Sequence, residues 1–283
     1  LNYGHTVNIL VTGVAGFIGY SLSKELLKKG FNVYGIDNLN TYYDIDLKKN
    51  RLNLLKDNKL DFKKIDLSNF EDLKKYIDQT NFDIVIHLAA QAGIRYSLVN
   101  PKEYINSNII GTFNLLENIK EKNIKHLIAA SSSSVYGNIQ NKIFSESLKV
   151  DEQISLYAST KKSLENLCFS YSHLYSMPTS ILRFFTVYGP WGRPDMAIYK
   201  FTKKILNCEE IEVYNKGNIY RDFTYIDDVI TAIYKLINFS PSENNRLSND
   251  SMSKIAPYRV LNIGNGGEVD INKIIYILEK ITG

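Results

Sequence analysis

The chain has 283 residues, of which 44% are hydrophobic and 23% charged, as in an ordinary globular protein. Its 34 basic and 30 acidic residues give a formal charge of +4, and the basic residues form no long run, which argues against nucleic acid as a partner. No apolar run reaches the ~18 residues of a transmembrane helix, so no membrane partner is expected.

The two cysteines, Cys168 and Cys208, lie far apart and belong to no Cys-x-x-Cys or histidine pattern. They predict no metal site, and reduced structural thiols favour a cytoplasmic location. Residues 1–7 lack the positive and apolar regions of a signal peptide, which agrees with that location.

Short apolar stretches alternate with stretches of helical spacing along the first two thirds of the chain. Strands are predicted at residues 7–12, 32–36, 62–65, 84–88, 127–130 and 180–184. The first intervening helix, residues 17–29, carries Phe17, Leu22 and Leu26 at helical spacing. Near-continuous apolar strands separated by helices predict an α/β fold with a doubly wound parallel sheet of the Rossmann type. Such sheets bind their ligands at the carboxyl ends of the strands.

The composition changes after Phe185. Residues 190–194 (Pro-Trp-Gly-Arg-Pro) predict a rigid loop, and residues 238–257, rich in Ser and Asn, predict an exposed loop. We expect two domains, a large one over residues 1–185 and a smaller one made mainly of residues 186–283. Segments of the second are expected to return to the first.

A glycine-rich turn follows the first predicted strand and opens the first helix. It consists of Gly13, Gly16, Phe17, Ile18 and Gly19 together with the two residues between the first glycines. Glycine lets the backbone approach a pyrophosphate closely, and the helix amino terminus adds free N–H groups and a partial positive charge. In this strand–turn–helix context the pattern predicts a cradle for a dinucleotide, held by residues 1–185.

An acidic residue, Asp37, ends the second strand and is followed by Asn38. Its carboxylate can accept hydrogen bonds from the adenosine ribose, and it would repel a 2′-phosphate. No Arg or Lys lies within the next ten residues, so NAD is favoured over NADP as the cofactor. Asp66 and Leu67 end the third strand, where Asp66 is equally consistent with facing the adenine and with capping the next helix.

Tyr157 and Lys161 are spaced i, i+4, which places them on one face of a helix. A lysine ammonium and an oxidised nicotinamide both favour the phenolate, so this tyrosine is a candidate base. On its own the pair is also typical of an exposed helix surface. However, it follows the fifth strand, which ends in four serines, residues 131–134, and a serine there can bond the substrate's reacting hydroxyl.

Together these motifs resemble the extended short-chain dehydrogenases that act on nucleotide sugars, over nearly the whole chain. The narrower resemblance is to UDP-glucuronate 4-epimerases. It rests on residues 36–44, 91–97, 183–197 (Arg-Phe-Phe-Thr-Val-Tyr-Gly-Pro-Trp-Gly-Arg-Pro-Asp-Met-Ala) and 221–228. The resemblance implies an NAD-binding Rossmann domain, a substrate-binding domain and conversion of UDP-glucuronate to UDP-galacturonate through a transient 4-keto sugar. It also implies a role in polysaccharide biosynthesis.

The resemblance assigns roles to individual residues. Tyr157 is the base, Lys161 tunes it and holds the nicotinamide ribose, and Ser132 polarises the hydroxyl, with Ser133 as the reserve choice. Cofactor contacts are implied for Leu88, Ala89, Ala90 and Asn108, with a buried helix amide as the alternative for Asn108. Substrate contacts are implied for Arg221 on the diphosphate, Arg193 and Arg95 on phosphate or carboxylate, and Thr186 on the sugar acid; each arginine could instead form a surface ion pair.

Two long helical stretches, residues 101–122 and 156–175, carry enough apolar residues to pack a partner. Family members pair these helices in a four-helix bundle, so a homodimer is expected. Family members also continue for several tens of residues past Gly283, so the substrate domain is expected to be incomplete in this chain.

Other activities stay open at this point. Decarboxylases and dehydratases of this superfamily carry an acidic residue just before Val-Tyr-Gly, where this chain has Ser133 and Ser134. An epimerase of UDP-galactose or of a UDP-N-acetylhexosamine is disfavoured by residues 193–197. A non-catalytic NAD-binding regulator is disfavoured because both Tyr157 and Lys161 are present.

Overall fold

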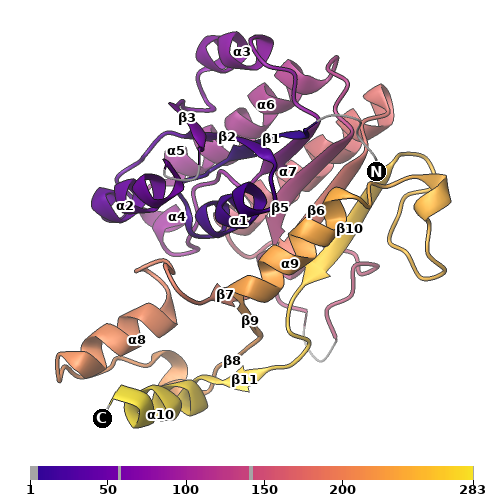
Figure 1. Ribbon diagram of the computed structural model, residues 1–283. Coiled ribbons are helices and arrows are strands. Elements are labelled where there is room, and N and C mark those ends of the chain that lie inside the picture. Colours follow the sequence, from indigo (N-terminus) through magenta and orange to yellow (C-terminus); the bar gives the residue numbers. More distant parts are fainter. Residues whose placement is uncertain (1–5, 57–58, 140–142, 283) are drawn as a thin grey trace.

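A seven-stranded parallel sheet forms the centre of the molecule (Figure 1). The computed structural model describes residues 6–56, 59–139 and 143–282. The strand order is β10-β6-β5-β4-β1-β2-β3. The strands are β1 (Asn8–Thr12), β2 (Asn32–Asp37), β3 (Asp61–Lys64), β4 (Ile84–His87), β5 (His126–Ser132), β6 (Thr179–Phe184) and β10 (Tyr258–Ile263).

The six predicted strands are confirmed, each within two residues of its expected bounds. Every residue of β4, β5 and β6 is buried, which explains why these strands read as continuous rather than alternating apolar runs. The seventh strand, β10, was not predicted. It pairs with β6 from Tyr258 opposite Thr179 to Ile263 opposite Phe184.

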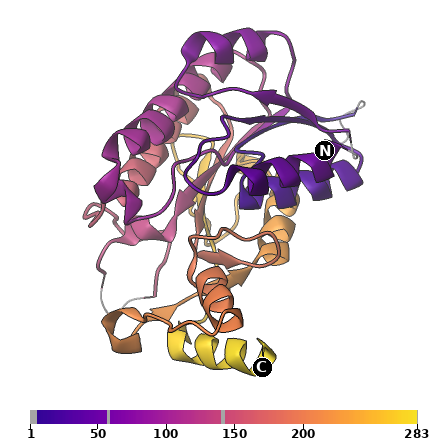
Figure 2. The same ribbon diagram turned by 90° about the vertical axis from the view of Figure 1, so that its left-hand side faces the viewer.

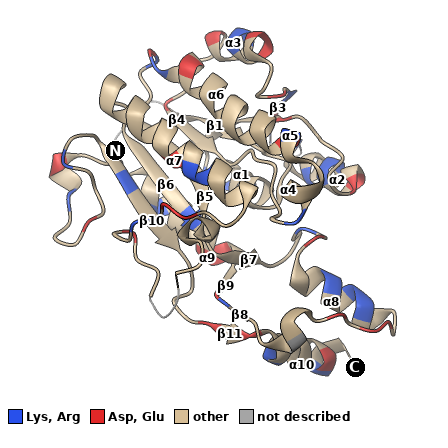
Figure 3. Ribbon diagram, turned by 180° about the vertical axis from the view of Figure 1, so that it is seen from behind, with Lys and Arg blue, Asp and Glu red and all other residues tan. Residues whose placement is uncertain are grey.

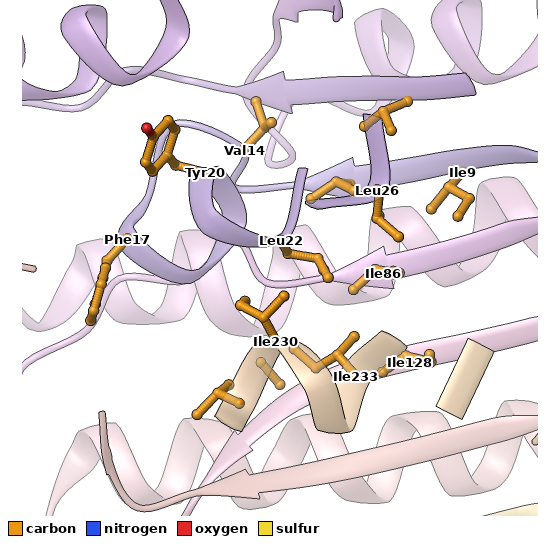
Figure 4. Close-up of a cluster of buried hydrophobic side chains, with 14 of the residues drawn as sticks. Ile9, Val14, Phe17, Tyr20, Leu22, Leu26, Ile86, Ile128, Ile230 and Ile233 are labelled. Atoms are coloured by element: carbon orange, nitrogen blue, oxygen red, sulfur yellow. The ribbon is translucent and has the colours of Figure 1, made fainter. Parts of the chain in front are cut away.

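Helices cover both faces of the sheet. One face carries α1 (Phe17–Lys28), α2 (Ile45–Lys56) and α9 (Ile226–Ile237), and the other carries α3 (Phe70–Asp78), α6 (Gly111–Ile119) and α7 (Leu156–Tyr175). Figure 4 shows Leu22 and Leu26 of α1 packed with Ile230 and Ile233 of α9 against the sheet. The doubly wound fold is therefore confirmed.

A smaller lobe lies beyond the carboxyl ends of the strands (Figure 2). It holds α8 (Ala197–Leu206), α10 (Ile271–Thr282) and two short sheets. One sheet pairs β7 (Thr186–Tyr188) with β9 (Phe223–Tyr225), and the other pairs β8 (Tyr220–Arg221) with β11 (Val269–Asp270). Between these pieces the chain returns to the large sheet as α9 and β10. The domain boundary at residue 185 stays a prediction.

The stretch 238–257 is less exposed than predicted. Asp250 lies within it, yet its side chain is only 3% exposed and forms an ion pair of 2.7 Å with Arg259 of β10. Met252 and Ala256 are buried as well. This loop is held against the sheet because the buried guanidinium of Arg259 needs a counter-charge.

Candidate active site

A cleft of about 2330 Å³ lies between the carboxyl edge of the sheet and the smaller lobe. Of the predicted site residues, all of which the structure describes, only Asn108 lies outside its lining. The lining includes Gly13, Gly16, Phe17, Ile18, Gly19, Asp37, Asn38, Asp66, Leu67, Leu88, Ala89, Ala90, Arg95, Ser132, Ser133, Tyr157, Lys161, Thr186, Arg193 and Arg221. Residues far apart in the sequence therefore meet around one cavity.

The glycine turn between β1 and α1 is too tight for side chains. Gly13 has φ +73°, and a Cβ on Gly19 would lie 2.2 Å from the carbonyl oxygen of Gly13. Gly16 is the residue preceding α1, and no side chain caps the helix there. The first N–H groups of α1 therefore face the cleft as donors for an anion, which fits a dinucleotide pyrophosphate.

Asp37 is fixed by backbone donors at the end of β2. Its carboxylate accepts hydrogen bonds from the N–H groups of Ala15 at 3.1 Å and Leu39 at 2.8 Å. Burial raises the pKa of Asp37, against the opposing effect of the nearby Lys48. The acidic group is thus tied to the glycine turn itself, at the place expected for the adenosine ribose.

Asp66 accepts hydrogen bonds from the side-chain amide of Asn38 at 2.9 Å and from the hydroxyl of Ser68 at 2.7 Å. The helix-capping alternative does not hold for α3, because its cap is Asn69, which accepts the N–H of Asp72. Burial opposes ionisation of Asp66, but these bonds outweigh it and lower its pKa. Asp66 and Asn38 thus form one polar corner of the cleft.

Tyr157 and Lys161 occupy the first two turns of α7. Ser155 caps this helix by accepting the N–H of Ala158 at 3.1 Å. The Lys161 side chain is buried and donates to the carbonyl of Ala130 in β5 at 2.8 Å, and burial lowers its pKa to about 8. The carbonyl of Ala130 in β5 thereby sets the direction of the Lys161 side chain.

The electrostatics of Tyr157 differ from the expectation. Burial raises its pKa, and the groups that lower it are the Ser132 hydroxyl, through a hydrogen bond, and the Arg193 guanidinium. Lys161 was predicted to be the main such group, but its ammonium is directed at the Ala130 carbonyl. Burial therefore favours the protonated phenol, and a further positive charge is needed for it to act as a base near neutral pH.

Ser132 ends β5, and its hydroxyl accepts the N–H of Ser134 at 3.2 Å, which starts the short helix Ser133–Tyr136. Its neighbour Ser131 points into a different environment, where it donates to the buried Glu165 at 2.6 Å. Of the serines at this strand end, Ser132 is the one coupled to Tyr157.

Asn108 lies in a π-helix, Ile105–Ile110, that interrupts the predicted helical stretch 101–122. Its side chain is 1% exposed and does not face the cleft, so the predicted direct cofactor contact is not supported. The amide instead accepts the N–H of Gln91 at 2.7 Å and donates to Gln91 and Thr160. Asn108 therefore joins the loop after β4 to the catalytic helix α7, because a buried amide needs all its partners.

The substrate arginines have partners within the chain. Arg193 forms two contacts with Asp195, at 3.0 and 2.5 Å, and Asp195 also accepts the hydroxyl of Tyr42 at 3.0 Å. Arg95 stacks on the ring of Tyr214, with its guanidinium carbon 3.5 Å from the centroid. These two guanidinium groups would have to change partners or share them to meet a phosphate or carboxylate.

Arg221 is exposed in β8 and donates to the Tyr220 carbonyl at 3.0 Å. Thr186 begins β7, where its N–H donates to the Asp222 carbonyl at 3.1 Å. Both residues belong to the smaller lobe and line the same cleft as the glycine turn.

One buried residue was missed. Arg51 of α2 is 0% exposed and lies between the glycine turn and residues 191–192. Its sequence context, Lys-Lys-Asn-Arg, is typical of a solvated helix face, so no local signal identifies it.

Metal-site clusters and membrane-spanning helices are both absent from the part of the chain that the structure describes. Among the described residues, no group of three or more His, Cys, Asp or Glu side chains is placed to hold a metal ion. Within the same ranges, no helix has the length and apolar character needed to cross a bilayer.

Comparisons with known proteins give matches over nearly the whole chain. Residues 9–263 match the model of the NAD dependent epimerase/dehydratase family. Protein CapI of Staphylococcus aureus is 50% identical over 98% of this chain and 84% of its own length. The UDP-glucuronate 4-epimerase of Thermodesulfobacterium geofontis is 45% identical over 97% of this chain and 80% of its own. The crystal structure of UDP-glucuronic acid 4-epimerase from Bacillus cereus with UDP-glucuronic acid and NAD is 36% identical, with a TM-score of 0.86, over 98% and 83% of the two chains.

Proposed function

Because the chain belongs to the NAD dependent epimerase/dehydratase family, we propose that it is an NAD-dependent 4-epimerase that interconverts UDP-glucuronate and UDP-galacturonate. The observation that carries the proposal is the meeting of Tyr157, Ser132 and Lys161 with the glycine turn in one cleft. Two relatives support the substrate, one named UDP-glucuronate 4-epimerase and one named probable UDP-glucuronate 4-epimerase; each is 45% identical over 97% of this chain.

The residues present fit NAD. The glycine turn leaves room for a pyrophosphate that a side chain at Gly19 would fill, the amino end of α1 offers donors, and Asp37 suits a ribose without a 2′-phosphate. The chemistry that bound NAD supplies is reversible removal of the hydrogen on carbon 4 of the sugar, together with a positive charge near the phenol.

Tyr157 takes the proton of the sugar's 4-hydroxyl on its phenolic oxygen and later returns it. Ser132 is proposed to hold that hydroxyl by a hydrogen bond, and its own hydroxyl lowers the pKa of the Tyr157 phenol. Arg193 keeps positive charge near the phenol. Lys161 is proposed to hold the nicotinamide ribose; burial lowers its pKa to about 8, so its ammonium form dominates at neutral pH. The two proton transfers cancel over one turnover.

The sugar acid is proposed to lie toward Arg193 and Thr186, because the charge of Arg193 acts on Tyr157. Arg221 and Arg95, which line the outer part of the same cleft, are proposed to hold the diphosphate. Ser133 stays the reserve choice for the hydroxyl contact. Arginine's planar fork suits both anions.

The test is to incubate the purified protein with UDP-glucuronate, without added NAD, and to identify the product by NMR. UDP-galacturonate is expected, because the cofactor is regenerated in every turnover and needs only to stay bound. UDP-xylose or UDP-arabinose would make the protein a decarboxylase. Turnover of UDP-galactose or a UDP-N-acetylhexosamine in its place would make it a neutral-sugar epimerase.

We also propose a cytoplasmic homodimer that supplies UDP-galacturonate to polysaccharide biosynthesis. Exposed apolar side chains gather on the segment from the π-helix into α6, with Ile105, Ile110 and Phe113 each about 40% exposed, and Leu174 near the end of α7 is 69% exposed. Pairing these helices between two copies would bury them. Light scattering at micromolar concentration is expected to give twice the mass of one chain, and a single-chain mass would contradict the proposal.

A further inference from the structure

Arg51 carries a permanent charge into the interior of the protein. The residue is 0% exposed, and its buried Nε has no hydrogen-bond partner among the residues that the structure describes. Within residues 6–56, 59–139 and 143–282, no carboxylate forms an ion pair with it. A buried charge is costly unless it is compensated, so its retention at this place calls for a function.

The hydrogen bonds of Arg51 end on three separate segments. Nη1 donates to the carbonyl of Ala15 in the glycine turn at 2.9 Å and to the hydroxyl of Tyr43 at 2.8 Å. Nη2 donates to the carbonyl of Trp191 at 2.6 Å. The guanidinium therefore bridges the cofactor side of the cleft to the loop of residues 189–196, which we call the Trp191 loop.

The Trp191 loop leads directly to the substrate side. Trp191 has φ +62°, a conformation that non-glycine residues rarely adopt, and its ring packs on Tyr20 of α1 with centroids 5.6 Å apart. Two residues later, Arg193 pairs with Asp195 and acts electrostatically on Tyr157. The position of the Trp191 carbonyl thus sets where Arg193 meets the proposed sugar site.

The cofactor side of Arg51 is equally constrained. The N–H of Ala15 donates a hydrogen bond to the carboxylate of Asp37, and the carbonyl of Ala15 accepts one from Arg51. A dinucleotide pyrophosphate over the glycine turn would bring negative charge near the guanidinium and offset the cost of burying it. Binding there would therefore stabilise the same arrangement of Arg51 that holds the Trp191 loop.

We propose that Arg51 is a positioning residue that couples dinucleotide binding on the glycine turn to the placement of the Trp191 loop, so that NAD and the UDP moiety strengthen each other's binding. The inference rests on the proposed function for the identity of the two ligands. Such coupling is reciprocal: the factor by which UDP tightens NAD equals the factor by which NAD tightens UDP.

The test measures NAD affinity by titration, with and without saturating UDP, for the wild type, Arg51→Met and Arg51→Lys. We expect UDP to tighten NAD binding in the wild type by at least ~5-fold, the low end of ordinary coupling. Arg51→Met is expected to weaken NAD binding and reduce the factor to about 1. Lysine keeps the charge but cannot span both carbonyls, so Arg51→Lys is expected to lose most of the coupling while folding normally.

The matched control is Lys49→Met, which removes a positive charge from the same helix at a side chain that is 55% exposed. It is expected to keep the wild-type coupling factor. An unchanged factor in Arg51→Met, or in Arg51→Lys if the methionine variant does not fold, overturns the proposal. A wild-type factor near 1 does so too.

The proposed activity and the proposed coupling through Arg51 can be tested separately. Coupling between NAD and UDP without epimerisation of UDP-glucuronate would remove the proposed function and leave the role of Arg51 standing. Epimerisation with independent NAD and UDP binding would do the reverse.

Discussion

The two walls of the cleft are built in different ways. On the cofactor wall, α1 buries Phe17, Tyr20, Leu22 and Leu26 among its residues and packs on both the sheet and α9. On the substrate wall, none of the ten residues of α8, all of them described, is buried, and lysines gather on it (Figure 3). The cofactor wall is therefore fixed by the core before any ligand arrives. The substrate wall contributes little to the core, so its substitutions are expected to act on substrate binding more than on folding.

A large effect on stability is expected from breaking the buried ion pair Glu165–Arg183 beside the sheet, whose side chains are 2% and 3% exposed. Glu165 also accepts from Ser131, next to the catalytic strand end. Arg183→Met removes the bidentate partner of the buried carboxylate and leaves it only the more distant Lys162, at 3.6 Å, as an ion-pair partner. We expect a loss of about 3 kcal/mol, the low end for a broken buried pair, in the free energy of unfolding measured in urea.

The control for this variant is Lys74→Met, which removes an ion pair with Asp78 on the surface of α3, where both side chains are about half exposed. No measurable change is expected there. If the loss in free energy of unfolding is no larger in Arg183→Met than in Lys74→Met, the buried ion pair does not stabilise the sheet more than a surface pair does.

A substitution of Tyr157 is expected to lower turnover without lowering the stability of the fold. Tyr157→Phe keeps the ring, which packs edge-on against Tyr104 at 6.2 Å, and removes the proposed proton acceptor. We expect normal folding and NAD binding but turnover reduced by at least ~100-fold, the low end for general acid–base catalysis. The assay is conversion of UDP-glucuronate followed by chromatography.

Tyr76→Phe is the matched control, since it also deletes a buried phenolic oxygen. Tyr76 belongs to α3, and its hydroxyl has no hydrogen-bond partner among the described residues. It should leave turnover unchanged. Near-normal turnover in Tyr157→Phe would remove Tyr157 from the mechanism. Lys161→Met should lower turnover and also weaken NAD binding, because its ammonium is proposed to serve both.

Cofactor choice is expected to depend on Asp37. Asp37→Ala removes a charged acceptor, worth about 1.5–3 kcal/mol when hydrogen-bonded, so NAD should bind roughly 10–100-fold more weakly and NADP should be less disfavoured. Titrations with both cofactors measure the change. Asp46→Ala, at a side chain that is 71% exposed on α2, should alter neither. An unchanged preference in Asp37→Ala would refute the ribose assignment.

The smallest effect is expected on the substrate wall. Leu206→Ala, at the end of α8, truncates a side chain that is 64% exposed, and stability should change by no more than about 0.5 kcal/mol. The same truncation on the cofactor wall, Leu26→Ala at a fully buried position of α1, should cost about 2–5 kcal/mol. Similar losses in the two variants, measured by urea unfolding, would erase the contrast between the walls.

What could be predicted from the sequence was local in origin. Tyr157 and Lys161 lie one helical turn apart, and the residues of the glycine turn are contiguous, so sequence spacing alone predicts both motifs. Strand β10 was missed because it carries Arg259 in its second position, a charge that breaks the apolar pattern until Asp250 is seen beside it. Its neighbour in the sheet, β6, has no comparable interruption at its start.

Arg51 and the direction of Lys161 depend on contacts that no local pattern encodes. Arg51 is buried by a carbonyl 140 residues away in the chain, at Trp191. Lys161 is turned from the phenol by the Ala130 carbonyl, 31 residues earlier. The role of Lys161 in lowering the pKa of Tyr157 therefore stays a prediction, while the contribution of Arg193 was not foreseen.

The π-helix at Ile105–Ile110 has a consequence for which sequence changes this protein can tolerate. Its wider turn holds an additional residue compared with an α-helix of the same rise, and side chains advance about 100° per residue in the α-helix that follows. Deleting one residue there would let the segment relax to a regular helix. Because the residue removed is the additional one, Leu115, Leu116 and Ile119 of α6 would keep their orientation relative to the residues before the π-helix. A one-residue deletion should therefore be better tolerated in this stretch than within α6, where it would rotate every later side chain by about 100°.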